Sequence, residues 1–191
     1  MEKNGILILS FKNQQAFSSW LEKNHNKSDG IWLQLFKKGS GVESITYAEA
    51  VEESLCYGWI DSLVNKLDET SYIQKFTPRR PKSIWSKINI SHIERLTKEG
   101  RMKESGLQEV ERAKADGRWQ QAYDSPTNMQ VPEDFITEVS KNKKAKEFFN
   151  TLNKTNKFAI AFQLHTAKKP ETRERRMKKF VEMMENQKKL H

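Results

Sequence analysis

The sequence of 191 residues contains a single cysteine, Cys56, and only four histidines. An internal disulfide needs two cysteines, so the chain is not a disulfide-framed secreted domain, and one thiol fits a reducing compartment. Four scattered histidines without a second cysteine also argue against a structural zinc site. We therefore expect a cytoplasmic protein with no bound metal and no cofactor.

Long apolar runs are missing as well. A helix that spans a bilayer needs about 20 consecutive apolar residues, and the core of a signal peptide needs roughly 7–15. The run near the N-terminus, residues 6–9, has only four. The sequence therefore predicts neither membrane insertion nor export by a signal peptide.

Apolar residues are scarce overall, at 36% of the chain, while charged residues make up 31%. Disorder is nevertheless not expected, because five Trp, ten Phe and four Tyr recur along the chain and can build a core. A chain of this length supports one substantial domain, or a compact domain with a smaller companion.

The net charge of +9 is concentrated near the C-terminus. Residues 1–132 hold 19 basic and 17 acidic side chains, whereas residues 133–191 hold 15 and 8. Such asymmetry suggests an anionic partner such as nucleic acid. Lysines outnumber arginines 25 to 9, however, and many are spaced as the solvent-facing side of amphipathic helices. A solvated helix surface is the interpretation we favour, and nucleic-acid binding by this basic module is the alternative.

Strand patterns are confined to the first 80 residues. Apolar runs predict strands at residues 6–9 and 31–36, and residues 59–77 alternate around a polar turn at 68–71, as a β-hairpin does. Pro78 cannot donate a hydrogen bond to a sheet, so we expect the hairpin to end there.

Capping residues mark the expected helices. Asn13 and Thr46 each precede an amphipathic stretch, and Thr46 lies three residues before a glutamate, the spacing of a capping box. The same pattern predicts helix starts at Ser91 and Ser105. Towards the C-terminus, two further stretches repeat apolar residues with helical spacing, and Pro170 suits the first turn of the last helix.

Together these patterns predict an α+β fold, with a small antiparallel or mixed sheet covered by helices and followed by an all-helical C-terminal module. We expect the α+β domain to span residues 1–123 and the helical module residues 133–191. Residues 124–132 contain two prolines and no apolar periodicity, so they are predicted to be the linker.

Four segments are richer in Trp, Arg, Asp and Gly than the rest of the chain. They read LCYGWIDS at residues 55–62, FTPRRPKSIWSKIN at 76–89, ADGRWQQAY at 115–123 and AKKPETRERR at 167–176. In this order and spacing they resemble the YdeI/OmpD-associated family, also called bacteriocin-protection proteins, over nearly the whole chain. The sequence departs from the family pattern at Ser54, Tyr57 and Ser62, where members typically have alanine, phenylalanine and glycine.

The resemblance implies a role rather than a reaction. The family takes its name from an association with bacteriocin and polymyxin tolerance and with a porin. The resemblance therefore implies a function in antimicrobial or envelope-stress tolerance, and it implies no catalytic residues.

Candidate ligand-binding residues lie in the motif segments. Asp61 follows the point where a helix meets the hairpin, and a partly buried carboxylate there needs a partner: an arginine such as Arg79 or Arg80, a turn amide, or a ligand. The two guanidinium groups precede a helical turn, a favourable place for a phosphate or carboxylate, although their stems can instead pack against Trp85. Cys56 has no histidine near it in sequence and is expected to be a buried structural residue.

The remaining candidates are Asn89, expected to cap the segment that follows it, and Arg118, Trp119 and Tyr123, which can wall a cleft or pack into the core. We expect the candidates to converge on one cleft between the two modules that binds a small anionic or mixed-charge molecule, or a protein partner. The enzyme alternative uses Asp61 as an acid or base in that cleft.

Overall fold

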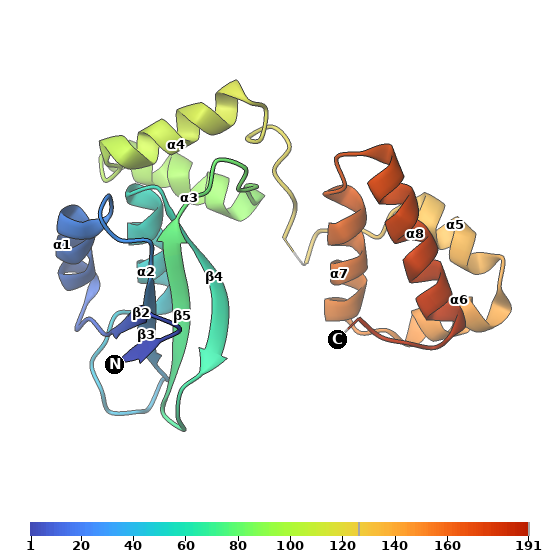
Figure 1. Cartoon of the computed structure of the whole chain (residues 1–191), viewed down its shortest axis with the longest axis horizontal. Helices are drawn as coiled ribbons and strands as arrows, with labels where there is room; N and C mark the ends of the chain where they lie inside the picture. The colour runs from blue at the N-terminus through green and yellow to red at the C-terminus, as the bar shows by residue number, and fades with distance from the viewer. Residues whose placement is uncertain (126, 191) are drawn as a thin grey trace. The chain divides into compact units, whose positions relative to one another are not determined.

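The computed structural model describes residues 1–125 and 127–190, so Pro126, within the predicted linker, and His191 lie outside the described residues. The described residues form a mixed five-stranded sheet and eight α-helices, which confirms the α+β class (Figure 1). They separate into two compact units. The first comprises Met1–Trp85 and Asn89–Gln121, and the second comprises Ser86–Ile88 and the chain from Ala122 onward.

The sheet belongs to the first unit and has the strand order β1-β2-β3-β5-β4. The strands are β1 (Glu2–Lys3), β2 (Ile6–Leu9), β3 (Ile31–Phe36), β4 (Trp59–Lys66) and β5 (Ser71–Pro78). Strands β2 and β3 run parallel, and the other neighbours are antiparallel. The sheet is therefore mixed, with β3 and β5 at its centre.

The predicted hairpin is confirmed as β4 and β5, and its turn is built around Asp68. The Asp68 carboxylate accepts hydrogen bonds from the backbone amides and hydroxyl groups of Thr70 and Ser71. These hydrogen bonds favour the charged form and lower the pKa of Asp68 to about 2. The turn fixes the register of the two longest strands.

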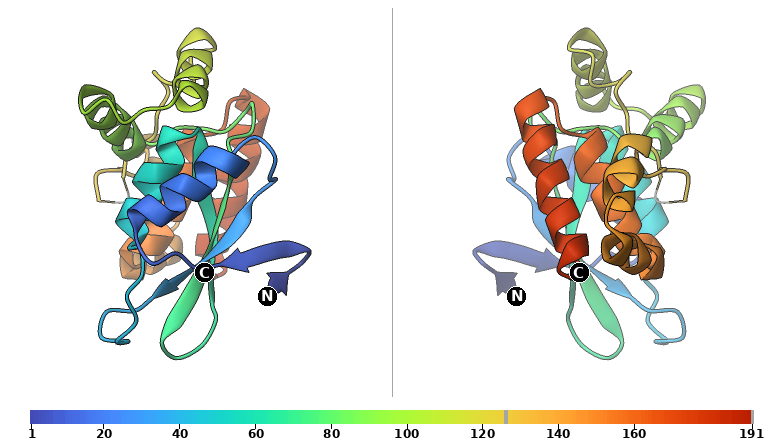
Figure 2. Two further views of the ribbon diagram at one scale, coloured as in Figure 1. Left: turned by 90° about the vertical axis from the view of Figure 1, so that its left-hand side faces the viewer. Right: turned by 90° about the vertical axis from the view of Figure 1, so that its right-hand side faces the viewer.

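Helices α1 (Gln14–Asn24) and α2 (Tyr47–Cys56) lie together on one face of the sheet (Figure 2). Both predicted caps are confirmed: the Asn13 side chain accepts from the amide of Ala16, and Thr46 forms a complete capping box. Phe17 of α1 reaches the sheet, where its ring centroid lies 6.1 Å from that of Phe76. Apolar side chains of β3 complete this core.

The next two helices begin earlier than the capping pattern predicted. Helix α3 spans Lys87–Lys98, so Ser91 lies inside it, and α4 spans Glu104–Ala115 with no side-chain cap at its start. The expected helix starts at Ser91 and Ser105 are therefore wrong. The Ser105 hydroxyl instead donates to the backbone carbonyl of Tyr57, 3.1 Å away. The hydroxyl that the local spacing predicts as a helix cap therefore makes a tertiary contact with the end of α2 instead.

The second unit is a helical module with its own core. Its helices are α5 (Glu133–Ser140), α6 (Lys143–Thr151), α7 (Lys154–His165) and α8 (Pro170–Glu185), and the expected Pro170 start is confirmed. Phe135, Phe149 and Phe180 meet at the centre of this core.

The arginines of the last motif act within the second unit. Arg173 donates two hydrogen bonds to the Asp134 carboxylate, which lowers the pKa of Asp134 and ties α8 to the start of α5. Arg176 donates to the backbone carbonyl of Gln163. In the described part of the chain, no helix is both long enough and apolar enough to cross a membrane.

Because each of the two units has its own hydrophobic core, we expect the two units to unfold in separate transitions. All five tryptophans (Trp20, Trp32, Trp59, Trp85 and Trp119) lie in the first unit, so their fluorescence reports on that unit alone. Phe180→Ala should destabilise the second unit by about 3–5 kcal/mol through the cavity it leaves. In a denaturant titration, the circular dichroism transition should then shift while the fluorescence transition stays in place.

The control for this prediction is Ile136→Ala, which truncates a half-exposed side chain of the same unit. It should change stability by less than about 1 kcal/mol. A joint shift of both transitions in Phe180→Ala would contradict the prediction.

Candidate functional site

Two of the four motif segments meet in the first unit around a pair of tryptophans. The Arg79 guanidinium carbon lies 3.5 Å from the centroid of the Trp85 ring, and the Trp119 ring lies 5.1 Å from that of Trp85. Arg79 donates to the carbonyl of Ile84, and Arg118 donates to the carbonyl of Ser83. The two arginines thus hold the loop before α3 against the tryptophans.

This arginine–tryptophan cluster is interior structure. Arg79 and Arg118 are only 5% and 4% exposed, so both guanidinium groups are buried beside the tryptophans. The Asp116 carboxylate lies 2.7 Å from the Arg118 guanidinium. Cation–π stacking and this ion pair offset the cost of burying the two charges.

Several predicted site residues lie elsewhere in the first unit. Asp61 accepts hydrogen bonds from the Tyr47 hydroxyl (2.7 Å) and the Gln74 amide (3.4 Å), rather than from the arginine considered as one of its possible partners. The Arg80 side chain is exposed.

Asn89 lies inside α3, where it cannot be the expected cap. Tyr123 belongs to the second unit, where its ring packs on Phe162 at 4.9 Å. Convergence of all the candidates on a cleft between the modules stays a prediction.

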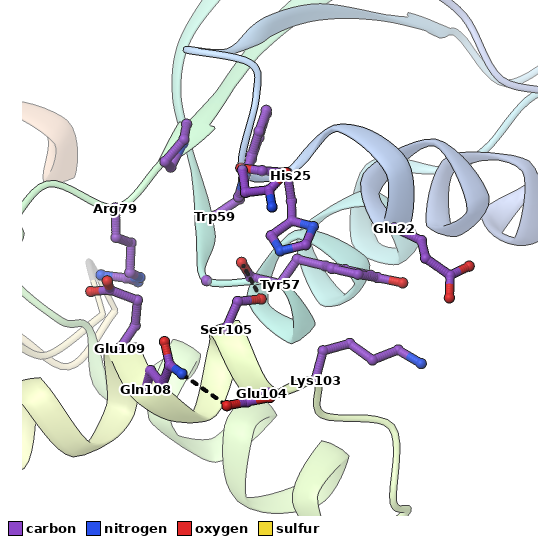
Figure 3. Close-up of a pocket in the computed structure, with 13 residues that line it drawn as sticks. Glu22, His25, Tyr57, Trp59, Arg79, Lys103, Glu104, Ser105, Gln108 and Glu109 are labelled. Carbon is purple, nitrogen blue, oxygen red and sulfur yellow. Dashed lines mark hydrogen bonds between the residues drawn. The ribbon is translucent and has the colours of Figure 1, made fainter.

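The first unit contains a pocket of about 600 Å³ (Figure 3). It is bounded by the end of α1, the α2–β4 junction, the residues that end β5, and the first turns of α4. Charges of both signs line it, together with polar and aromatic side chains: Arg79, Lys103, Glu22, Glu104, Glu109, His25, Tyr57 and Trp59. Of the sequence-predicted site residues, only Arg79 lines this pocket.

His25 is held in place at the pocket wall. Its Nδ1 lies 2.9 Å from the backbone carbonyl of Leu21, and its own carbonyl accepts from Trp59 Nε1 at 3.0 Å. Its ring lies against that of Tyr57, with centroids 5.3 Å apart. When Nδ1 carries the proton and donates to Leu21, Nε2 is the ring nitrogen that can accept a hydrogen bond from a ligand.

The wall opposite His25 is the first turn of α4, which docks directly on the end of α2. The backbone amide of Lys103 donates to the carbonyl of Cys56 at 3.1 Å, beside the Ser105–Tyr57 hydrogen bond. A Cβ at Gly106 would lie 2.2 Å from the carbonyl oxygen of Cys56. Only glycine lets the two backbones approach so closely, and the docked α4 groups then satisfy carbonyls at the end of α2.

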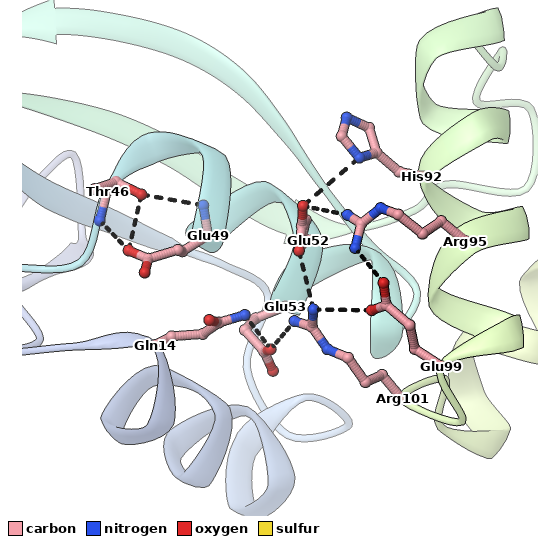
Figure 4. A network of polar contacts seen from close by, with 9 residues as sticks. All are labelled: Gln14, Thr46, Glu49, Glu52, Glu53, His92, Arg95, Glu99 and Arg101. Carbon is pink, nitrogen blue, oxygen red and sulfur yellow. Dashed lines mark hydrogen bonds and ion pairs between the residues drawn. The ribbon is translucent and has the colours of Figure 1, made fainter.

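An ion-pair network holds the chain just before α4 (Figure 4). Arg101 reaches Glu52 at 3.0 Å and Glu53 at 2.6 Å, both on α2, and Glu99 at 3.4 Å. Arg95 of α3 pairs with the same Glu52 and Glu99. Glu53 is 7% exposed, and its carboxylate pairs with Arg101 and accepts a hydrogen bond from the Gln14 amide. The ion-pair network and the close contact between Gly106 and Cys56 together hold the start of α4 in place, where it forms one wall of the pocket.

Cys56 lies beneath this contact and is 1% exposed, as expected for a buried structural residue. Burial, followed by the nearby Glu53 charge, raises the pKa of its thiol to about 12. A nucleophilic cysteine needs a lowered pKa and access to substrate, and Cys56 has neither. Among the described residues, no group of three His, Cys, Asp or Glu side chains is placed to hold a metal ion.

Most pocket residues carried no signal in the sequence. His25 lies in a predicted polar turn, and Glu22, Lys103 and Glu109 belong to none of the four motif segments. The available signals were the motif segments at residues 55–62 and 76–89, which contain Tyr57, Trp59 and Arg79, and Gly106 inside a helical pattern, since glycine there costs about 1 kcal/mol relative to alanine and is often kept for close packing.

Family models match both parts of the chain. Residues 9–109 match a family described as a domain of unknown function (DUF8412). Residues 128–187 match a family described as bacteriocin-protection, YdeI or OmpD-associated. No curated protein and no solved structure matches the chain.

Gly106→Ala should weaken the docking of α4. The new methyl group collides with the backbone of Cys56 rather than with a flexible side chain, so we expect the free energy of unfolding to fall by about 1–3 kcal/mol or more. Leu107→Ala, at an exposed position in the same helix, should change it by only about 0.5 kcal/mol. Urea unfolding followed by fluorescence measures both, and equal effects would contradict the close-contact account.

The Cys56 thiol should not react in the folded protein. At pH 8 we expect negligible reaction with a chromogenic disulfide reagent in buffer and stoichiometric reaction in denaturant, with Cys56→Ala as the blank. Rapid labelling of the native chain would contradict the burial.

The raised pKa also predicts a pH dependence of stability. The unfolded chain releases the thiol proton above pH 9.0, whereas the folded chain keeps it. The contribution of this thiol to the free energy of unfolding should therefore be lost as pH rises from 9 towards 12.

Proposed function

We propose, from the premise that this chain belongs to the YdeI- or OmpD-associated, bacteriocin-protection family, that its first unit binds a small molecule of mixed charge. The proposed binding site is the pocket between α1, the α2–β4 junction and α4. We infer that binding there serves tolerance to an antimicrobial compound or to envelope stress. The family description supports this role, and the pocket supports the ligand class.

The observation that carries the proposal is the composition of the pocket wall. A volume of about 600 Å³ suits a small molecule, since ligand pockets typically span about 300–1,000 Å³. Arg79 and Lys103 supply positive charge, while Glu22 and Glu104 supply negative charge. A ligand with a single charged group would leave one set of these side chains without a counterpart.

The direction of α4 suggests where each ligand charge lies. The helix N-terminus carries partial positive charge, and α4 has no side-chain cap there, so an anionic group is favoured beside Lys103. An ammonium group is favoured towards Glu22 at the end of α1, where His25 Nε2 can accept one of its protons. The rings of Tyr57 and Trp59 can cover an apolar body between the two charges.

Binding is the function that this geometry favours over catalysis. The enzyme alternative relied on Asp61, which lies on β4 and does not line the pocket. The nucleic-acid alternative concerns the second unit, whose lysines are nearly all exposed and are spread over several helices, whereas the pocket belongs to the first unit.

Calorimetric titration with phenylalanine, phenylalanine amide and phenethylamine tests the proposal. The free amino acid carries both charges and an apolar body, whereas its two analogues lack the carboxylate. We expect the amino acid to bind most tightly, and Lys103→Gln to weaken it about tenfold, which corresponds to about 1.4 kcal/mol.

The matched control is Lys98→Gln, an exposed lysine of α3 outside the pocket. It should leave the affinity unchanged. Equal losses in the two variants, or binding of the amine as tight as that of the amino acid, would contradict the proposed ligand class.

A further inference from the structure

The sheet of the first unit has one long open edge. Strand β1, at one edge, has two residues, whereas β4, at the other, has eight. In the part of the chain that the structure describes, no strand pairs with the outer side of β4. An unpaired edge presents backbone N–H and C=O groups with which a further strand can pair.

The middle of this edge is apolar. Leu63 and Val64 are each 62% exposed, in a chain with a mean hydropathy of −0.85. Among the described residues, they are the only large, exposed hydrophobic side chains that are neighbours in sequence. The exposed apolar surface of the edge is therefore centred on one point of β4.

The sequence of β4 is complementary to itself about that point. In an antiparallel pair of two β4 strands centred between Leu63 and Val64, Asp61 of each copy faces Lys66 of the other. Ser62 faces Asn65 in the same arrangement. Opposite charges directly across a strand pair stabilise it, and like charges destabilise it.

The bulge in β4 allows Asp61 of one copy to face Lys66 of the other. Residues that face each other across a strand pair must project from the same side of the sheet, and two residues five apart on a regular strand do not. In β4, Asp61 pairs with Phe76 and Lys66 with Tyr72, which lie four apart on β5. The extra residue between Asp61 and Val64 therefore puts Asp61 and Lys66 on the same side.

The two charges are also available for this contact. The Asp61 carboxylate is oriented by the Tyr47 hydroxyl at 2.7 Å. Lys66 is exposed and has no ion pair within the described residues. We propose that two copies of this chain pair antiparallel through β4 and form a continuous ten-stranded sheet with two Asp61–Lys66 ion pairs across a twofold axis.

Sedimentation equilibrium of the full chain over a concentration series tests the proposal. We expect the average mass to rise from 22.4 kDa towards twice that value. Lys66→Asp places like charges opposite each other and should weaken association by about tenfold or more. Asp61→Lys combined with Lys66→Asp restores opposite charges in both pairs and should recover most of the lost affinity.

Leu63→Lys is a second variant, and it leaves the Asp61 contacts intact. It should also reduce association, whereas Leu107→Lys, at an exposed leucine of α4, should not. Circular dichroism of each variant checks its fold. A wild-type chain that stays at 22.4 kDa throughout, or a dimer that neither Lys66→Asp nor Leu63→Lys weakens, would overturn the proposal.

Discussion

The contact between the end of α2 and the start of α4 is the constraint on which the first unit depends. The carbonyls at the end of α2 receive hydrogen bonds from Lys103 and Ser105, and Gly106 allows the backbones to approach. This contact buries Cys56, places Lys103 and Glu104 opposite His25, and so creates the pocket. A larger residue at Gly106 would alter the helix packing and the pocket together.

Arginine and lysine side chains occupy different environments in this chain. Arg79 and Arg118 are buried against tryptophan rings and backbone carbonyls, and Arg101 joins two glutamates of α2 to the start of α4. These positions use the planar guanidinium, which stacks on rings and donates several hydrogen bonds in fixed directions. The more numerous lysines mostly remain on the surface. The motif arginines therefore build the framework beside the pocket, and Arg79 alone among them lines it.

The parts of the fold that follow local rules could be predicted from the sequence. The β4–β5 hairpin, the caps at Asn13 and Thr46, and the Pro170 helix start each depend on neighbouring residues only. The starts of α3 and α4 could not be predicted, since tertiary contacts such as the one made by Ser105 decide where each helix begins.

The site was harder to predict than the fold. The tryptophan-rich motifs suggested a ligand cleft; within the first unit, Trp85 and Arg118 are buried, and Trp119 packs on Trp85. The pocket gathers residues from four parts of the chain: Tyr57, Trp59 and Arg79 belong to two of the motif segments, whereas His25 and Lys103 belong to none. Their proximity follows from the docking of α4 on α2, which local sequence patterns do not encode.

The most direct measurement is a heteronuclear NMR titration of the ¹⁵N-labelled chain with phenylalanine. If the pocket binds a molecule of mixed charge, the largest shift changes should occur at the amides of Gly58, Lys103 and Ser105, and the amides of α5 to α8 should stay unchanged. Absence of any change at millimolar ligand, or changes confined to the helical second unit, would contradict the account.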